Sequence, residues 1–199
     1  MAILDNRPLL LSELEFEARV ALIQQGGTRA ASAALSDEDL ASALDWAIGQ
    51  RLALAEATRL QVFDVDAAEV AKAVKQFEVQ IAGPSKVEAF LAAQEATPGQ
   101  LAAVLQRGLR VSRFLDTKVK LSARVTEEDM SRFYALHASE LGDQPYDRVR
   151  DGIKTQLMRE RYRVLAKKLL DDLRAKADVR IVAPFAQQAS SPDPGAARP

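Results

Sequence analysis

Apolar residues recur along most of this chain at steps of three and four, the spacing of one buried face of an α-helix. One stripe comprises Leu40, Leu44, Ile48, Leu52 and Ala55, and a weaker one comprises Leu101, Leu105, Gly108, Ser112, Leu115 and Val119. Segments that alternate apolar and polar residues, as a half-buried strand does, are few and short. The pattern therefore predicts a mostly α-helical, multi-helix fold.

The longest stripe begins after Tyr146 and comprises Val149, Ile153, Leu157, Val164, Leu165, Leu169 and Leu173. A helix of about 30 residues would be about 45 Å long at 1.5 Å per residue. We expect this long C-terminal helix to support the others and to pack against the helices that begin after Ser12 and Ser36.

Helix starts are predicted by a Ser, Thr or Asp that is followed three residues later by an acid or Gln, because the two side chains can satisfy free amides reciprocally. This pattern predicts starts at Ser12, Ser36, Asp66, Ser85, Thr97 and Thr126. Pro98 suits a first helical position, and we expect Pro145 to begin the last helix in the same way. Gly26 and Gly27 are expected to end the first helix.

Short strands are predicted at the two ends of the chain. Residues 2–4 and 8–10 resemble a hairpin around a polar turn at 5–7, and residues 179–182 alternate weakly. Because neither segment would be stable alone, we expect Ile3 or Leu9–Leu10 to pair with Val179–Ile181 in a small β element. The folded domain would then span residues 1–183, and the Pro-, Ser- and Ala-rich residues 184–199 would be a disordered tail.

Composition excludes several classes of function. Lys and Arg number 27 against 28 Asp and Glu, so the basic excess of a nucleic-acid-binding protein is missing. No Cys is present, which excludes disulfides and thiol catalysis. No apolar run approaches the roughly 18 residues of a membrane span. The first five residues lack a basic region before an apolar one, so we expect no signal peptide in this chain.

Candidate catalytic groups are sparse. His137 is the only histidine, and a metal site or a catalytic triad requires partners for it. Gly26-Gly27 lacks the context of a phosphate-binding loop, and Asp64, Asp66 and the acids at 127–129 lie where carboxylates favour a helix start. We therefore predict no catalytic residue, metal or cofactor. The basic stretch between Arg159 and Arg180 is interpreted as a solvated helix face, with attraction to acidic clients or anionic membrane surfaces as the alternative.

Several segments, in order, resemble the chaperone domain of SurA and its relatives among the parvulin-type peptidyl-prolyl isomerases. The likeness lies in the motifs Ile3-Leu4-Asp5-Asn6-Arg7, Leu11-Ser12-Glu13-Leu14-Glu15, Leu44-x3-Ile48-x3-Leu52-x3-Glu56-Ala57, Val65-Asp66-Ala67-Ala68-Glu69-Val70, Val125-Thr126-Glu127-Glu128-Asp129-Met130 with Phe133-Tyr134, Tyr146 through Ile153 with Leu157, and Leu173 through Ile181. In that family the isomerase domain follows the tyrosine matched by Tyr134. Here only residues 135–145 separate Tyr134 from Tyr146, whereas an isomerase domain needs on the order of a hundred residues. The resemblance thus implies a chaperone module without its enzyme.

The resemblance implies ATP-independent binding of unfolded or extended polypeptides, such as outer-membrane or exported proteins, in the periplasm. It places the client in a groove between the early helices and the long helix. Met130, Phe133 and Tyr134, with Tyr162 facing them, are the candidate peptide-binding residues, although core packing is the alternative for each aromatic. The competing hypothesis is a structural or interaction module that forms a homodimer, swapped or not, or docks on a fixed partner.

Overall fold

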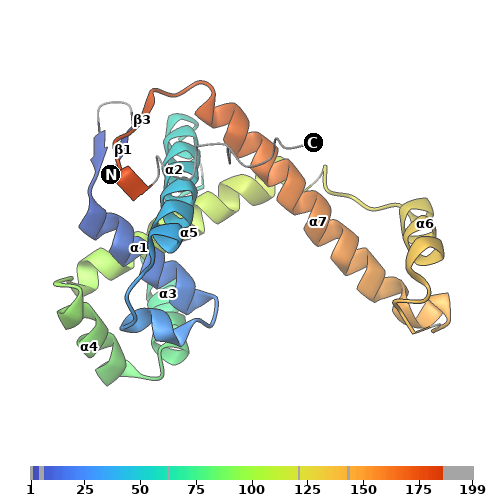
Figure 1. Ribbon diagram of the computed structural model, residues 1–199, viewed down its shortest axis with the longest axis horizontal. Coiled ribbons are helices and arrows are strands. Elements are labelled where there is room, and N and C mark those ends of the chain that lie inside the picture. Colours follow the sequence, from blue (N-terminus) through green and yellow to red (C-terminus); the bar gives the residue numbers. More distant parts are fainter. Residues whose placement is uncertain (1, 5–6, 62, 121, 143, 186–199) are drawn as a thin grey trace, which may run out of the picture.

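The computed structural model describes residues 2–4, 7–61, 63–120, 122–142 and 144–185 (Figure 1). The predicted mostly α-helical fold with a small β element is confirmed. In chain order the elements are β1 (Ala2–Leu4), β2 (Arg7–Leu9), α1 (Leu11–Gln24), a 3₁₀ turn (Thr28–Ala31), α2 (Asp37–Arg59), α3 (Ala67–Gln80), α4 (Pro84–Ala93), α5 (Pro98–Val119), α6 (Glu127–His137), α7 (Tyr146–Arg174) and β3 (Val179–Ile181).

The two ends of the chain meet in one antiparallel sheet of order β2-β1-β3. Ile3 lies opposite Arg180, and Ala2 lies opposite Ile181, so the predicted pairing of the ends is confirmed for β1. β2 pairs with the other side of β1 and does not meet β3. In the predicted turn, Arg7 belongs to β2, and residues 5–6 lie outside the described residues.

Four of the six predicted helix starts are confirmed. The side chains of Ser36, Asp66, Thr97 and Thr126 each accept a hydrogen bond from the backbone N–H three residues later. The two others are wrong. α1 begins at Leu11, because Glu13 accepts from the backbone N–H of Leu10 at 3.2 Å, and Ser12 caps nothing.

The start predicted at Ser85 is displaced by Pro84, which occupies the first position of α4. Gly83 precedes it with a φ of 113°, a conformation that is costly for a residue with a Cβ. Pro145 likewise differs from the prediction, since it precedes α7 and does not occupy its first turn. Gly26 and Gly27 end α1 as predicted, because their N–H groups donate to Ile23 and Leu22 at 2.9 Å.

Helices α1–α5 and the sheet form a body, and α7 extends from it as an arm with α6 at its far part (Figure 1). α7 has 29 residues, close to the predicted length. Its main contacts are with α2, α5 and α6. The predicted packing on α2 is therefore confirmed, whereas α1 is not among the main neighbours of α7 in the described residues. The predicted stripe also fails at Val164, which is 61% exposed.

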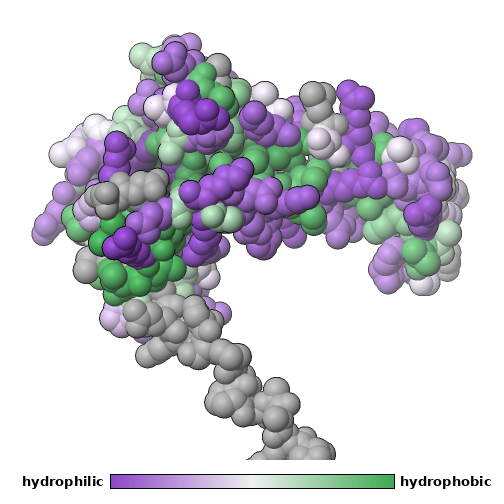
Figure 2. All heavy atoms as spheres, turned by 90° about the horizontal axis from the view of Figure 1, so that it is seen from above, coloured by the Kyte–Doolittle hydropathy of each residue, from purple (hydrophilic) through white to green (hydrophobic). Residues whose placement is uncertain are grey.

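Three apolar clusters hold the body together. The sheet packs on α2 through Leu4, Leu9, Leu44 and Ile48. A second cluster joins α1, α3, α4 and α5, and a third joins α2, α5 and α7 around Phe114. Viewed from above, hydrophobic side chains gather on the body, whereas the middle of the arm is mostly hydrophilic (Figure 2).

The end of the described chain belongs to this core. Phe185 packs against the cluster that holds the sheet on α2, and Ala183 is 1% exposed. Phe185 thus adds to this core, and the disordered tail predicted for residues 184–199 stays a prediction. The rest of the predicted tail, 186–199, lies outside the described residues.

Candidate functional site

Trp46 is the only tryptophan of the chain, and its side chain is 38% exposed on α2. Three adjoining cavities share Trp46 and Gln50 in their walls. We call these three cavities together the Trp46 groove. A tryptophan at the centre of a concave surface offers a large apolar contact area with a polar N–H group.

The largest part of the Trp46 groove has a volume of about 560 Å³ and lies between α2 and α7. α7 contributes residues at helical spacing, including Tyr162, Ala166 and Leu170, so one face of the long helix forms a wall. Gly49 of α2 lies against Leu170 of α7, since a Cβ there would be in van der Waals contact with Leu170 Cδ1 at 3.4 Å.

The second part, of about 410 Å³, lies among α2, α3 and α5 and has Trp46 in its wall. Its apolar walls include Leu105, Val111 and Leu115, and its polar groups are mostly amides from Gln24, Gln50, Gln76 and Gln80. Gln80 Nε2 donates to the backbone oxygen of Gln24 at 3.2 Å. Its Oε1 is buried, and no hydrogen-bond partner for it lies among the described residues.

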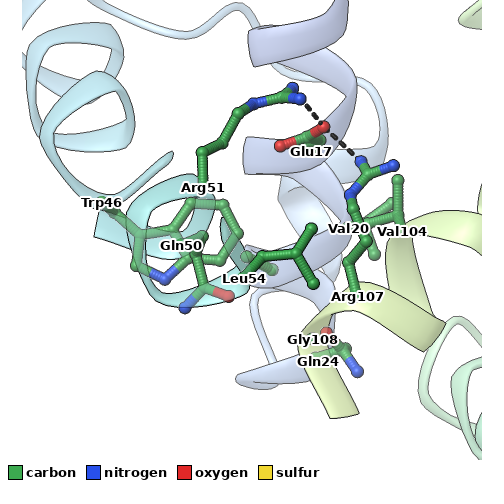
Figure 3. A pocket seen from close by; sticks show the side chains of 11 residues that line it. Glu17, Val20, Gln24, Trp46, Gln50, Arg51, Leu54, Val104, Arg107 and Gly108 are labelled. Carbon is green, nitrogen blue, oxygen red and sulfur yellow. Dashed lines mark hydrogen bonds and ion pairs between the residues drawn. The ribbon is translucent and has the colours of Figure 1, made fainter. Parts of the chain in front are cut away.

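The third part is a small well of about 40 Å³ beside Trp46 and Gln50 (Figure 3). Glu17 of α1, which is 6% exposed, lies at this well between two arginines. Its Oε1 accepts a hydrogen bond from Arg51 of α2 at 2.9 Å and another from Arg107 of α5. One carboxylate thus joins three helices in the wall of the groove, because a buried charge requires close partners.

Tyr162 has a defined hydrogen bond in the wall. Its hydroxyl donates to Asp116 Oδ1 of α5 at 2.9 Å. Burial of the phenol, together with this hydrogen bond and the charge of Asp116, raises the pKa of Tyr162 to about 12. The phenol is therefore neutral at physiological pH, and it ties α7 to α5 at the groove.

The structure divides the predicted binding residues between two places. Tyr162 lines the Trp46 groove, whereas the three others belong to α6. Met130 is only 3% exposed. The Phe133 ring stacks on His137 with centroids 4.4 Å apart, and the Tyr134 ring meets Tyr146 at 5.3 Å. Tyr162 was expected to face these residues of α6. Instead, its hydroxyl binds Asp116 of α5, and the α6 rings contact His137 and Tyr146.

Sequence reasoning missed Trp46 and the glutamines. Trp46 does not belong to the apolar stripe through Leu44 and Ile48. A large aromatic residue on the polar side of a predicted helix was therefore the signal that could have identified it as a binding residue. The glutamines come from α1, α2 and α3, and no spacing in the sequence reveals that they converge.

Other chemistry is sparse in the part of the chain that the structure describes. No group of three or more His, Asp or Glu side chains there could hold a metal ion. His137 contacts Glu140 at 3.0 Å, in addition to Phe133. None of the helices in the described ranges combines the length and apolarity that a membrane crossing requires.

Comparison with protein-family models, curated proteins and solved structures finds no match to this chain.

Proposed function

We propose that this protein binds unfolded or extended polypeptides in the Trp46 groove and holds them without ATP. By resemblance to the SurA-type chaperone domain, its clients are outer-membrane or other exported proteins, and its compartment is the periplasm. The observation that carries the proposal is the exposed Trp46 at the junction of three cavities.

The chemistry of the groove suits clients of many sequences. Trp46, Tyr162 and the aliphatic walls offer apolar contact that does not depend on a particular partner residue. Each glutamine amide carries both donors and an acceptor, and an extended peptide presents the same groups at every residue except proline. Such a surface recognises an unfolded backbone more than a sequence.

Trp46 makes the proposal directly measurable, since it is the only indole in the chain. Addition of an unfolded client that lacks tryptophan should shift the emission of Trp46 to shorter wavelength as the client removes water from the ring. The same client should aggregate less when the protein is present. Trp46→Ala should weaken holding roughly tenfold, equivalent to about 1.4 kcal/mol, with a nearly unchanged melting temperature.

Two glycines provide a matched pair of variants. A Cβ at Gly108 or at Gly152 would meet nothing within 4 Å, and both residues are helical. Gly108 lines the groove, whereas Gly152 lies on the arm, outside the groove walls. Gly→Gln at either position should stabilise its helix by roughly 0.5–1 kcal/mol. Only Gly108→Gln should reduce client holding.

Two outcomes would contradict the proposal. If Trp46→Ala and Gly108→Gln hold clients as well as the parent protein does, the groove is not the binding site. If the parent protein holds no client and instead forms a stable dimer that covers Trp46, the structural-module hypothesis is favoured.

We also propose that the protein is not a peptidyl-prolyl isomerase. Tyr134 and Tyr146, which would flank the isomerase domain of the resembled family, are joined by a short link and contact each other. An X-Pro peptide should therefore isomerise at its uncatalysed rate, over roughly tens to hundreds of seconds. Catalysis that survives repurification would contradict this part of the proposal.

A further inference from the structure

We propose that the Trp46 groove selects polypeptide segments in which acidic residues flank an apolar or aromatic side chain. This inference rests on the proposed function and adds the class of client that the groove prefers. It is carried by the excess of cationic side chains in the groove walls and by two of them, Arg159 and Arg163, that have no ion-pair partner among the described residues.

The walls are cationic although the chain as a whole is not. The formal net charge of the protein is −1, yet the groove is lined by six cationic side chains against three anionic ones. The cations are Arg51, Arg107, Arg159, Arg163, Lys167 and Arg174. A concave surface with one sign of charge attracts ligands of the opposite sign.

The anions are already engaged by part of this set. Glu17 is shared by Arg51 and Arg107. Asp45 pairs with Arg174, and Asp171 pairs with Lys167 at 2.7 Å. These contacts leave the walls with a positive surplus concentrated on α7.

Arg159 and Arg163 supply the free part of that surplus. Neither has a hydrogen-bond or ion-pair partner among the described residues, and both are exposed. They are four residues apart and therefore share one face of α7. Tyr162 lies between them in sequence and lines the same part of the groove.

This arrangement matches a particular kind of segment. An apolar side chain of the client would contact Trp46 and Tyr162, and a neighbouring carboxylate would reach the guanidinium of Arg159 or Arg163. Arginine binds carboxylates through two parallel hydrogen bonds. A lysine in place of the client's carboxylate would be repelled by the same two side chains, so the groove discriminates by charge.

The test uses two synthetic peptides with the same apolar and tyrosine core, one flanked by glutamates and the other by lysines. Emission of Trp46 reports binding of each. The acidic peptide should bind roughly five- to tenfold more tightly at low salt, since each exposed charge pair contributes modestly. The preference should shrink to under about twofold near 1 M salt, where the screening length is about 3 Å.

Charge reversal locates the effect. Arg159→Glu with Arg163→Glu should abolish or invert the preference, while Trp46 still responds to the peptide core. Arg148→Glu with Lys168→Glu is the matched control, because these exposed residues of α7 change the net charge equally and do not line the groove. The control should keep the preference of the parent protein.

The outcomes separate this inference from the proposed function. Equal binding of both peptides, or an unchanged preference after charge reversal at 159 and 163, overturns the charge selectivity alone. Failure of both peptides to bind overturns the proposed function and the selectivity with it. A single-stranded oligonucleotide that displaces the acidic peptide at lower concentration than the free peptide does would also overturn the inference.

Discussion

The guanidinium of Arg150 donates two hydrogen bonds to the carboxylate of Glu127, from Nε at 3.1 Å and from Nη2 at 2.7 Å. This contact attaches the first residue of α6 to α7. A second contact reinforces it, since Asp129 pairs with Arg161 at 2.7 Å. The docking of α6 on the arm therefore depends on two carboxylates.

Acid should release α6 from α7. The hydrogen bonds from Arg150 and then Tyr146 lower the pKa of Glu127 from 4.5 to about 2, and Thr126, assisted by Arg161, lowers the pKa of Asp129 from 3.8 to about 2. Because both folded pKa values lie below the unfolded ones, this stabilisation is complete above about pH 4.5 and is lost as the pH falls towards 2.

The methyl resonance of Met130, which is buried on α6, reports this release in an NMR titration. Glu127→Gln should loosen α6 already at neutral pH and flatten its acid dependence. Glu128→Gln is the control, because the ion pair of Glu128 among the described residues is with Arg132 of the same helix. An acid transition in which α6 and the body unfold together would contradict local release.

Tyr162 should ionise well above the ordinary range of a tyrosine. Burial raises its pKa to about 12, with a further contribution from Asp116. Because the folded pKa lies above the ordinary value of 10, the associated stability is intact below pH 10 and is lost as the pH rises towards 12. Tyrosinate absorbance measures the titration. Tyr162→Phe should remove the step near pH 12, and Asp116→Asn should lower the pKa of Tyr162 only partly, since burial is the larger cause. A step unchanged in Tyr162→Phe would show that another tyrosine is responsible.

Loss of Glu17 should destabilise the body. Glu17→Ala leaves Arg51 and Arg107 facing each other, and their side chains are only 31% and 35% exposed. Removal of one partner from a fully buried pair costs about 3–5 kcal/mol, so partial solvation of these arginines suggests about 2–3 kcal/mol. Urea unfolding measures the change. Glu128→Ala, in a pair that is 67% and 81% exposed, should cost under about 0.5 kcal/mol. Similar losses in the two variants would mean that Glu17 contributes only as a surface charge does.

Two serines distinguish a true helix cap from an apparent one. Ser36 Oγ accepts from the N–H of Asp39 at 3.1 Å, so Ser36→Ala should cost about 1 kcal/mol. Ser12 lies within α1 and is exposed, so Ser12→Ala should change the free energy of unfolding by less than about 0.5 kcal/mol. Equal losses would show that the side chain of Ser12 contributes at the start of α1 after all.

These serines also indicate how far the sequence predicts the fold. Capping and apolar spacing are local, and they predicted most helices together with the pairing of the chain ends. The errors arose where two local signals competed, as between Ser85 and Pro84, or where tertiary contacts decided. Tertiary contacts decide which residues of α7 are buried. Val164 continues the apolar stripe, but no neighbouring helix covers it.

The site was harder to predict than the fold. Tyr162 was predicted as a binding residue, and it lines the Trp46 groove. The other predicted residues, on α6, make their contacts away from the groove. The groove is assembled from helices far apart in the sequence, and α7 meets α2 where Leu170 lies against Gly49. Such convergence is a property of packing, and no single segment encodes it.

The sheet has a consequence for the order in which the chain folds. β1 pairs with β3, although more than 170 residues separate the two strands along the chain. Contacts between segments so far apart form slowly, because the intervening chain must first be ordered. The β1–β2 hairpin would be only marginally stable by itself, and Ala2 and Leu4 share their apolar cluster with Ala183. We therefore expect the sheet to close late in folding, after the helices between its strands have assembled.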